Sequence, residues 1–519
     1  MLQALFGFFL IMMAATFGYE PSVLENNNAI AKPGSQAGRL KVDESSTGDL
    51  DLQSHDRQHA QHPASNESVS ANNPQGEAVR RTKDVEADDY DPHDHQDVAH
   101  PTSNVDTLFH LLKGCIGTGI LAMPEAFKYA GYVVGFIGTA IIGVICTLAV
   151  HMLIDSEYEL SKRRRVPSLS YPQVGRAALE DGPPKLRWLA RYMSGCINTF
   201  VLANQMGACI AYIIFVASNM QAVVDTWTGT ALPLRVWMVI VTVPLILLSW
   251  VRDLKYLAPF STIAISVTLG SFGVILYYVF RSIPVLDDKV AVGELSKFPL
   301  FFGTAMFSLE AMGVMIPLKN EMKNPKAFGG WNGVLNRAMV PIVVLFICLG
   351  LFGYLQFGNA VEASVTLSLP QDEVLAQCVK LMMALAIFVS HGLMNYVNFD
   401  TIWTKTLLPR CEARKLSPRT QLLYEYLVRT AIVLVHFTLG AIFTNLGLVI
   451  SLVGALCLSM IGLTFPAMIH MATFWYSCPS RRSFVWLVVR DGAVVVLGFV
   501  ALVIGTYVSI NDIIKDMNK

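Results

Sequence analysis

From residue 106 to residue 511 the chain alternates between long apolar runs and short polar connections. An uncharged run of about 20 residues is long enough to cross a bilayer as a helix. The pattern therefore predicts an all-α integral membrane protein with about eleven transmembrane helices. The expected spans are 107–128, 131–154, 190–220, 234–251, 259–280, 298–318, 336–357, 374–399, 428–445, 447–472 and 491–511.

Polar or short segments flank this transmembrane domain of residues 106–511. Residues 1–18 are apolar but lack the basic residues that open a signal peptide and are shorter than a span, so their role is uncertain. Residues 19–105 are polar without periodicity, which predicts a disordered cytoplasmic tail. Residues 512–519 form a short C-terminal tail. The histidines of the N-terminal tail would serve metal binding or pH sensing only if a fold brought them together: His55, His59, His62, His93, His95 and His100.

The basic residues of the connections predict the orientation. Lys and Arg gather after the second, fourth, sixth, eighth and tenth spans, as in Lys162-Arg163-Arg164-Arg165, and the connection after the seventh span has acidic residues and no basic one. Basic connections stay on the cytoplasmic side of a membrane. The N-terminus should therefore be cytoplasmic and the C-terminus on the opposite side.

Composition excludes several classes of function. The chain is 53% hydrophobic and 15% charged, and its formal net charge of zero argues against a nucleic acid partner. The nine cysteines show no metal-type spacing, so we expect neither a metal site nor a disulfide framework. No nucleophile elbow or phosphate loop is present in the sequence. We therefore expect no enzyme activity and no cofactor.

The first expected span contains a glycine-rich break. Three glycines and a proline lie between Gly114 and Pro124, and both residue types weaken a helix. A discontinuous helix in a membrane usually exposes backbone N–H groups to an anionic ligand. Gly117, Thr118 and Gly119 are therefore candidate ligand-binding residues, although small residues also serve close helix packing.

The sixth expected span repeats this pattern from Phe302 to Pro317 and carries Glu310 alone in an uncharged run. A charged group at the membrane centre costs at least ~2.5 kcal/mol and usually has a function. We take Ser308, Leu309 and Glu310 as candidate ligand-binding residues, with a structural hydrogen bond as the alternative role of Glu310. Two interrupted helices five spans apart indicate two inverted five-helix repeats followed by one extra helix.

His110 lies one helical turn before Gly114. Histidine changes its charge near neutral pH, so His110 is a candidate proton carrier. Glu310 is the second candidate, and an ordinary hydrogen-bonding role for His110 stays open.

These segments resemble a known family. Thr107-Leu108-Phe109-His110-Leu111-Leu112-Lys113-Gly114 with Gly117-Thr118-Gly119-Ile120-Leu121-Ala122-Met123-Pro124 resembles the first helix of the proton-coupled amino acid transporters, within the amino acid/auxin permease family. Ser308-Leu309-Glu310-Ala311-Met312-Gly313 looks like the sixth helix of that family, and Tyr90-Asp91-Pro92-His93 is similar to its invertebrate members. The resemblance covers roughly residues 90–511. Lys319 departs from it, because many members have an acidic residue there.

The resemblance implies symport of protons with small neutral amino acids such as glycine, alanine and proline, by alternating access. It assigns proton coupling to His110, the substrate carboxylate to the backbone of Gly117 and Gly119, and the family's sixth-helix glutamate to Glu310. The proton would be the coupling ion. The expected partners are amino acids, protons and the lipid bilayer, and the family occupies plasma and lysosomal or endosomal membranes.

A second class of function is an amino-acid sensor. Such a protein would bind its substrate and signal to growth control through cytoplasmic partners of the long polar tail. A channel is disfavoured because the sequence shows no pore-like ring of charge.

Overall fold

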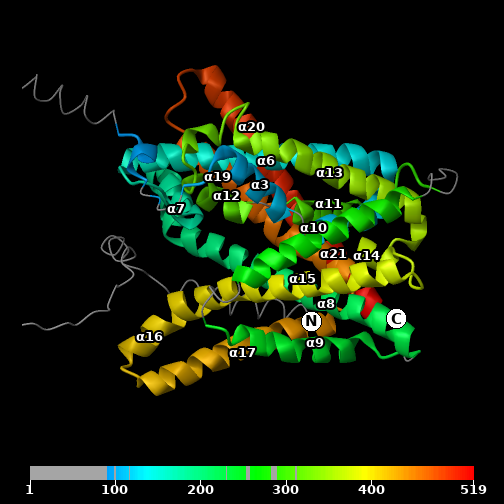
Figure 1. Cartoon of the computed structure of the whole chain (residues 1–519). Helices are drawn as coiled ribbons and strands as arrows, with labels where there is room; N and C mark the ends of the chain where they lie inside the picture. Colours follow the sequence, from blue (N-terminus) through cyan, green and yellow to red (C-terminus); the bar gives the residue numbers. More distant parts are fainter. Residues whose placement is uncertain are drawn as a thin grey trace, which may run out of the picture. The chain divides into compact units, whose positions relative to one another are not determined.

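The apolar runs predicted as spans coincide with helices in the computed structural model (Figure 1). The structure describes residues 90–96, 98, 101–115, 117–229, 231–252, 258–281, 289–309 and 312–518. Of Lys113, Ala258 and residues 312–314 it describes the backbone alone. The apolar segment 1–18 and most of the polar tail lie outside these residues.

The first half of the domain consists of a divided helix and four continuous ones, with a shorter helix in one connection. Its helices are α3 (Asn104–Cys115), α4 (Thr118–Leu121), α5 (Met123–Ala130), α6 (Tyr132–Arg164), α7 (Tyr171–Asp181), α8 (Ala190–Thr228), α9 (Leu234–Ser249) and α10 (Ala258–Phe280). Short 3-10 turns are η1 (Pro92–His95) and η2 (Pro184–Leu189). The helix α7 lies in what the apolar pattern left as a connection, because its polar face hides the helical period.

The second half begins with another divided helix. Its helices are α11 (Phe298–Ser308), α12 (Met312–Asn320), α13 (Val334–Phe357), α14 (Val365–Ser368), α15 (Val374–Phe399), α16 (Leu408–Ala413), α17 (Pro418–Ile442), α18 (Leu446–Val453), α19 (Phe465–Thr473), α20 (Arg481–Val500) and α21 (Thr506–Met517). Wider π-helical stretches continue three of them: η7 (Asp400–Leu407), η8 (Gly454–Thr464) and η9 (Ala501–Gly505). Short 3-10 turns are η4 (Leu295–Lys297), η5 (Pro325–Ala327) and η6 (Gly358–Ala360).

Eight helices in the described part of the chain are long and apolar enough to cross a membrane. The expected spans outside this group are the first and the sixth, which are divided, and α9, which has 16 residues. The fold class predicted from the sequence, an all-helical membrane protein with broken first and sixth helices, is thereby confirmed. The number of eleven spans stays a prediction.

Helices that correspond in the two predicted repeats pack against one another. The helix α6 contacts α13, α8 contacts α15, and α9 contacts α17. A two-fold relation between repeats brings corresponding helices together in this way. The packing thus fits the two inverted repeats expected from the paired helix breaks.

The N-terminal tail differs from the expectation in its last residues. We predicted disorder as far as residue 105, but Asp91 and Thr102 both contact the connection after α12. Asp91 forms an ion pair with Lys326 at 2.6 Å. The N–H of Thr102 donates to the carbonyl of Glu321 at 2.8 Å, and the N–H of Lys323 donates to the carbonyl of Thr102 at 2.9 Å. These long-range partners supply the order that the local sequence lacks.

Candidate binding site

The first helix break leaves an uncapped helix start. Gly117 precedes α4 in an extended conformation (φ −145°, ψ −153°), and no side chain caps this end of the helix. The N–H groups of a first helical turn have no partner within the helix. Thr118 is 4% exposed, whereas a Cβ added to Gly117 would meet no atom of the described residues within 4 Å. Backbone donors therefore border open space at Gly117.

The second break follows Ser308. Leu309 ends α11, its N–H donating to the carbonyl of Ala305 at 3.0 Å, and α12 begins at Met312. Ser308 and Leu309 are buried. Glu310 lies outside the described residues, so its roles in substrate binding and proton coupling stay predictions.

The two breaks touch each other. The single hydroxyl proton of Ser308 is shared between the carbonyl of Gly119, at 2.7 Å from Oγ, and that of Thr304, at 2.8 Å. A Cβ added to Gly119 would lie 2.7 Å from the Cα of Ser308, so no larger residue fits without displacing backbone. The structure therefore brings together the candidates from the first and the sixth helix. Binding of a substrate by them stays a prediction.

His110 differs from the residues of the two breaks in its exposure to solvent. Its side chain is exposed on α3, whereas Gly119 and Ser308 are buried. The structure thus leaves proton coupling by His110 as a prediction.

Glu125 is a buried carboxylate that the sequence analysis missed. It lies on α5 and is 8% exposed. The hydroxyl of Tyr129 donates to its Oε1 at 2.8 Å, and its Oε2 is buried without a hydrogen-bond partner among the described residues. Gly447, at the start of α18, packs so closely that an added Cβ would collide with this carboxylate. An acidic residue inside the expected span 107–128 was the available signal, by the argument used for Glu310.

A buried ion pair between α6 and α12 is a second feature that the sequence analysis missed. The Nζ of Lys319 lies 2.6 Å from Oε2 of Glu157, and each side chain is 2% exposed. Oε1 of Glu157 also accepts from the hydroxyl of Ser161 and the N–H of Leu169, both at 3.2 Å. Lys319, an unusual residue by the family resemblance, thus has a defined electrostatic partner in this chain.

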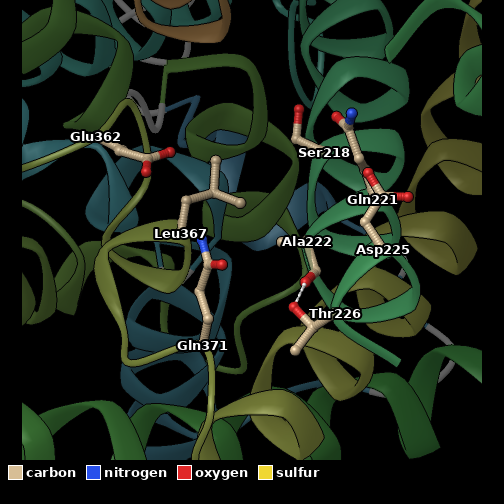
Figure 2. Close-up of a pocket in the computed structure, with 8 residues that line it drawn as sticks. All are labelled: Ser218, Gln221, Ala222, Asp225, Thr226, Glu362, Leu367 and Gln371. Carbon is tan, nitrogen blue, oxygen red and sulfur yellow. Dashed lines mark hydrogen bonds between the residues drawn. The ribbon is translucent and has the colours of Figure 1, made fainter. Parts of the chain in front are cut away.

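A cleft of about 580 Å³ opens beside α8. Figure 2 shows Glu362 and Leu367 on one side and α8 residues, including Asp225, on the other. Burial raises the pKa of Glu362, while the positive charges of Lys380 and Lys128 act to lower it. Lys128 also donates to the carbonyl of Val361 at 2.9 Å, which ties α5 to this wall of the cleft.

Comparisons with known proteins agree with this geometry. The profile of the family described as "Transmembrane amino acid transporter protein" matches residues 100–511. The chain belongs to this family. The "Proton-coupled amino acid transporter-like protein pathetic" of Drosophila melanogaster is 36% identical over 428 residues, which cover 82% of this chain and 88% of that protein. The "Probable amino acid transporter skat-1" of Caenorhabditis elegans is 25% identical over 438 residues, which cover 82% and 92%.

A solved structure shows the same fold. The inward-facing conformation of Mhp1 superposes with a TM-score of 0.51 at 12% identity and covers 81% of this chain and 91% of that one. The amino acid transporter family and this fold identify the chain as a multi-pass membrane transporter of amino acids rather than an enzyme.

Proposed function

We propose that this transporter carries small neutral amino acids of the alanine, glycine and proline class together with protons, by alternating access. The membrane would be the plasma membrane or a lysosomal or endosomal membrane, with the N-terminus cytoplasmic. The observation that carries the proposal is the contact between the two helix breaks beside the open space at Gly117. The name of the 36% identical Drosophila relative supports proton coupling.

The polarity of the site favours a zwitterion. The N–H groups at the start of α4 suit a carboxylate, because a helix amino end carries partial positive charge. Carbonyls near Ser308 and Leu309, aided by Glu310, would accept bonds from the ammonium group. The described side chains at the breaks, Thr118, Ser308 and Leu309, carry no charge, which suits a substrate whose side chain is also uncharged.

Three groups are available for the coupled proton. His110 and Glu310 follow from the sequence, and Glu125 is the buried carboxylate on α5. A proton bound to Glu125 would neutralise a charge packed against Gly447 of α18. Because α18 packs on α11, loading and release of that proton would act on both broken helices. Protonation of Glu125 would thus be coupled to movement of the broken helices.

Uptake of labelled alanine, proline and glycine tests the function. Cells that express the protein would be compared at about pH 5.5 and about pH 7.5, with and without sodium. We expect uptake that rises at acid pH and needs no sodium. Sodium-dependent uptake that ignores pH would contradict proton coupling.

Variants separate the candidate proton carriers. Glu125→Gln mimics the protonated carboxyl and should remove the acid stimulation while exchange of internal for external alanine persists. His110→Ala should likewise abolish uptake driven by a pH gradient. Retention of gradient-driven uptake by either variant would remove that residue from the coupling mechanism. The sensor alternative rests on the tail before Tyr90, which lies outside the described residues.

A further inference from the structure

Three metal-ligating side chains meet inside the helix bundle. Cys209 of α8, His391 of α15 and His436 of α17 place one ligand atom each within 4.8 Å of the others, and all three residues are buried. The two imidazole rings meet edge to face with centroids 5.6 Å apart. None of these residues belongs to either helix break.

The polar atoms of this cluster are incompletely paired within the described structure. Nε2 of His391 and both ring nitrogens of His436 are buried without a hydrogen-bond partner among the described residues. Such atoms are rare in folded proteins and call for a ligand or another explanation. The amide of Asn398 donates to the sulfur of Cys209 at 3.4 Å. This bond would stabilise the thiolate that a metal ligand requires, as outer partners of metal ligands commonly do.

We propose that Cys209, His391 and His436 bind one copper(I) ion. Thiolate and imidazole are the ligands that this soft cation prefers. One thiolate and one monovalent cation sum to zero charge, whereas zinc(II) would leave a net positive charge in a medium of low polarity. Loading exchanges the thiol proton for the metal, and that proton leaves to water.

The spacing requires little movement. A metal bound at about 2.0–2.3 Å from each ligand atom holds a trigonal set of ligands roughly 3.5 Å apart. Side-chain torsions therefore need to close the triangle by about one ångström. Because the three residues are at most 1% exposed, the metal enters during folding or in a more open state.

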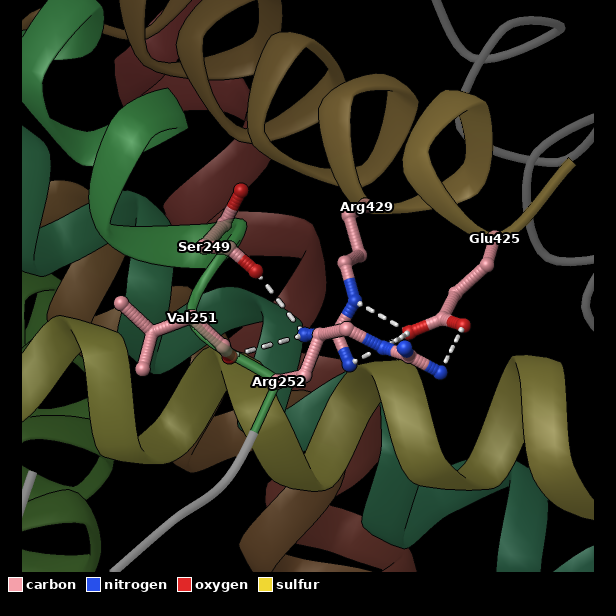
Figure 3. Close-up of polar contacts among 5 residues, drawn as sticks. All are labelled: Ser249, Val251, Arg252, Glu425 and Arg429. Carbon is pink, nitrogen blue, oxygen red and sulfur yellow. Dashed lines mark hydrogen bonds and ion pairs between the residues drawn. The ribbon is translucent and has the colours of Figure 1, made fainter. Parts of the chain in front are cut away.

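The surrounding helices are fixed by a separate polar network. Figure 3 shows the carboxylate of Glu425 accepting from both Arg252 and Arg429. The guanidinium of Arg429 also donates to the carbonyls of Ser249 and Val251. That guanidinium lies 3.6 Å from the ring centroid of Phe399 on α15. His436 follows Arg429 by two helical turns on the same face, about 10 Å along α17. The metal would add a second link between α15 and α17, beside the contact of Arg429 with Phe399, and would connect both helices to α8.

Metal content of the purified full-length chain tests the proposal. Cells grown with added copper should yield about one copper per chain, measured by elemental mass spectrometry. Cys209→Ala and His391→Gln/His436→Gln should lose at least nine-tenths of it. Cys378→Ala, which removes an exposed thiol from α15, is the matched control and should keep the copper. Retained alanine uptake shows that the variants are folded.

X-ray absorption at the copper edge identifies the ligands. We expect a monovalent, three-coordinate metal with one sulfur and two nitrogen neighbours. A copper(I) chelator should also lower the thermal midpoint of the wild type and leave that of Cys209→Ala unchanged, which tests the site without relying on a destabilised variant. Wild-type protein with less than a tenth of a copper per chain, equal copper in wild type and the Cys209→Ala variant, or stoichiometric zinc in place of copper would each overturn the proposal.

Discussion

The contact between Gly119 and Ser308, called here the crossing of the two helix breaks, differs from the buried ion pair Glu157–Lys319 in charge and in strength. At the crossing, the helices meet through a backbone carbonyl, one hydroxyl and a glycine, with no charged side chain among the described residues. In the ion pair, Glu157 of α6 and Lys319 of α12 bring opposite charges to within 2.6 Å of each other, and both side chains are almost completely buried. The first contact is weak and leaves backbone groups for a ligand, whereas the second is costly to break.

The difference teaches where movement is expected. A single neutral hydrogen bond contributes only about 0.5–1.5 kcal/mol, so the crossing can rearrange in a transport cycle. Removing one partner of a buried ion pair costs about 3–5 kcal/mol. Small residues therefore mark the moving part and buried charges mark a fixed part, and substitutions in the two regions should affect different measurements.

The largest effect is expected for Glu157→Gln, which leaves the charge of Lys319 buried without its partner. We expect the free energy of unfolding to fall by about 3–5 kcal/mol, measured by thermal unfolding in detergent. Glu157→Leu combined with Lys319→Met should recover most of it, because the double change leaves no buried charge. The control is Glu180→Gln, whose partners Arg164 and Arg176 are partly exposed and whose loss should cost under about 1 kcal/mol. Equal losses for Glu157→Gln and the control would remove the contrast between the regions.

The next effect is expected for Gly119→Ala. Its Cβ would lie 2.7 Å from the Cα of Ser308, and overpacking of this kind costs about 1–3 kcal/mol. Alanine uptake should fall roughly tenfold, with unchanged amounts of protein at the membrane. Gly270→Ala on α10 is the control, since no atom of the described residues lies within 4 Å of its added Cβ. Normal uptake by Gly119→Ala would show that the crossing does not limit transport.

A smaller effect is expected for Ser308→Ala, which removes the hydrogen bond between the breaks. The loss of about 1 kcal/mol should lower uptake roughly fivefold. Ser390→Ala is matched to it, because the hydroxyl of Ser390 donates only to the carbonyl one turn earlier in its own helix, at 2.9 Å. Uptake by Ser308→Ala as high as that of the Ser390 variant would deny the bond a role in transport.

The smallest effect concerns His93, which stacks on Tyr158 with ring centroids 5.0 Å apart. Burial lowers the pKa of His93, and the charge of Lys319 lowers it further, while Asp91 and Glu157 act to raise it. The docked state therefore favours neutral His93. The stabilisation of docking by neutral His93 is complete above the ordinary histidine pKa of about 6.5. It is lost as the pH falls through the lowered pKa of the docked state.

Hydrogen exchange of residues 91–103 measures this docking. Between about pH 7.5 and about pH 5.5, exchange corrected for its intrinsic pH dependence should rise in the wild type. His93→Phe keeps an aromatic ring and should remove the rise, whereas the variant His95→Phe at an exposed position should retain it. A rise of the same size in the His93 variant would assign the effect to another group.

The sequence predicted the local features and missed the contacts that join distant segments. Apolar length predicted the helices, and Gly117 and Ser308 mark breaks because glycine, proline and small polar residues act within one or two turns. Glu157 and Lys319 stand 162 residues apart, and each resembles an ordinary residue at the end of a span. The cluster of Cys209, His391 and His436 comes from three helices, so linear spacing contains no trace of it.

Purified protein in sodium-free liposomes tests the central claim most directly. Addition of alanine outside vesicles that hold a pH-sensitive dye should acidify the interior, with labelled alanine accumulating when the outside is acid. In the Gly119→Ala variant both signals should fall together, roughly tenfold. Alanine entry without proton entry, or entry that requires sodium, would contradict a proton symporter built on the crossing of two broken helices.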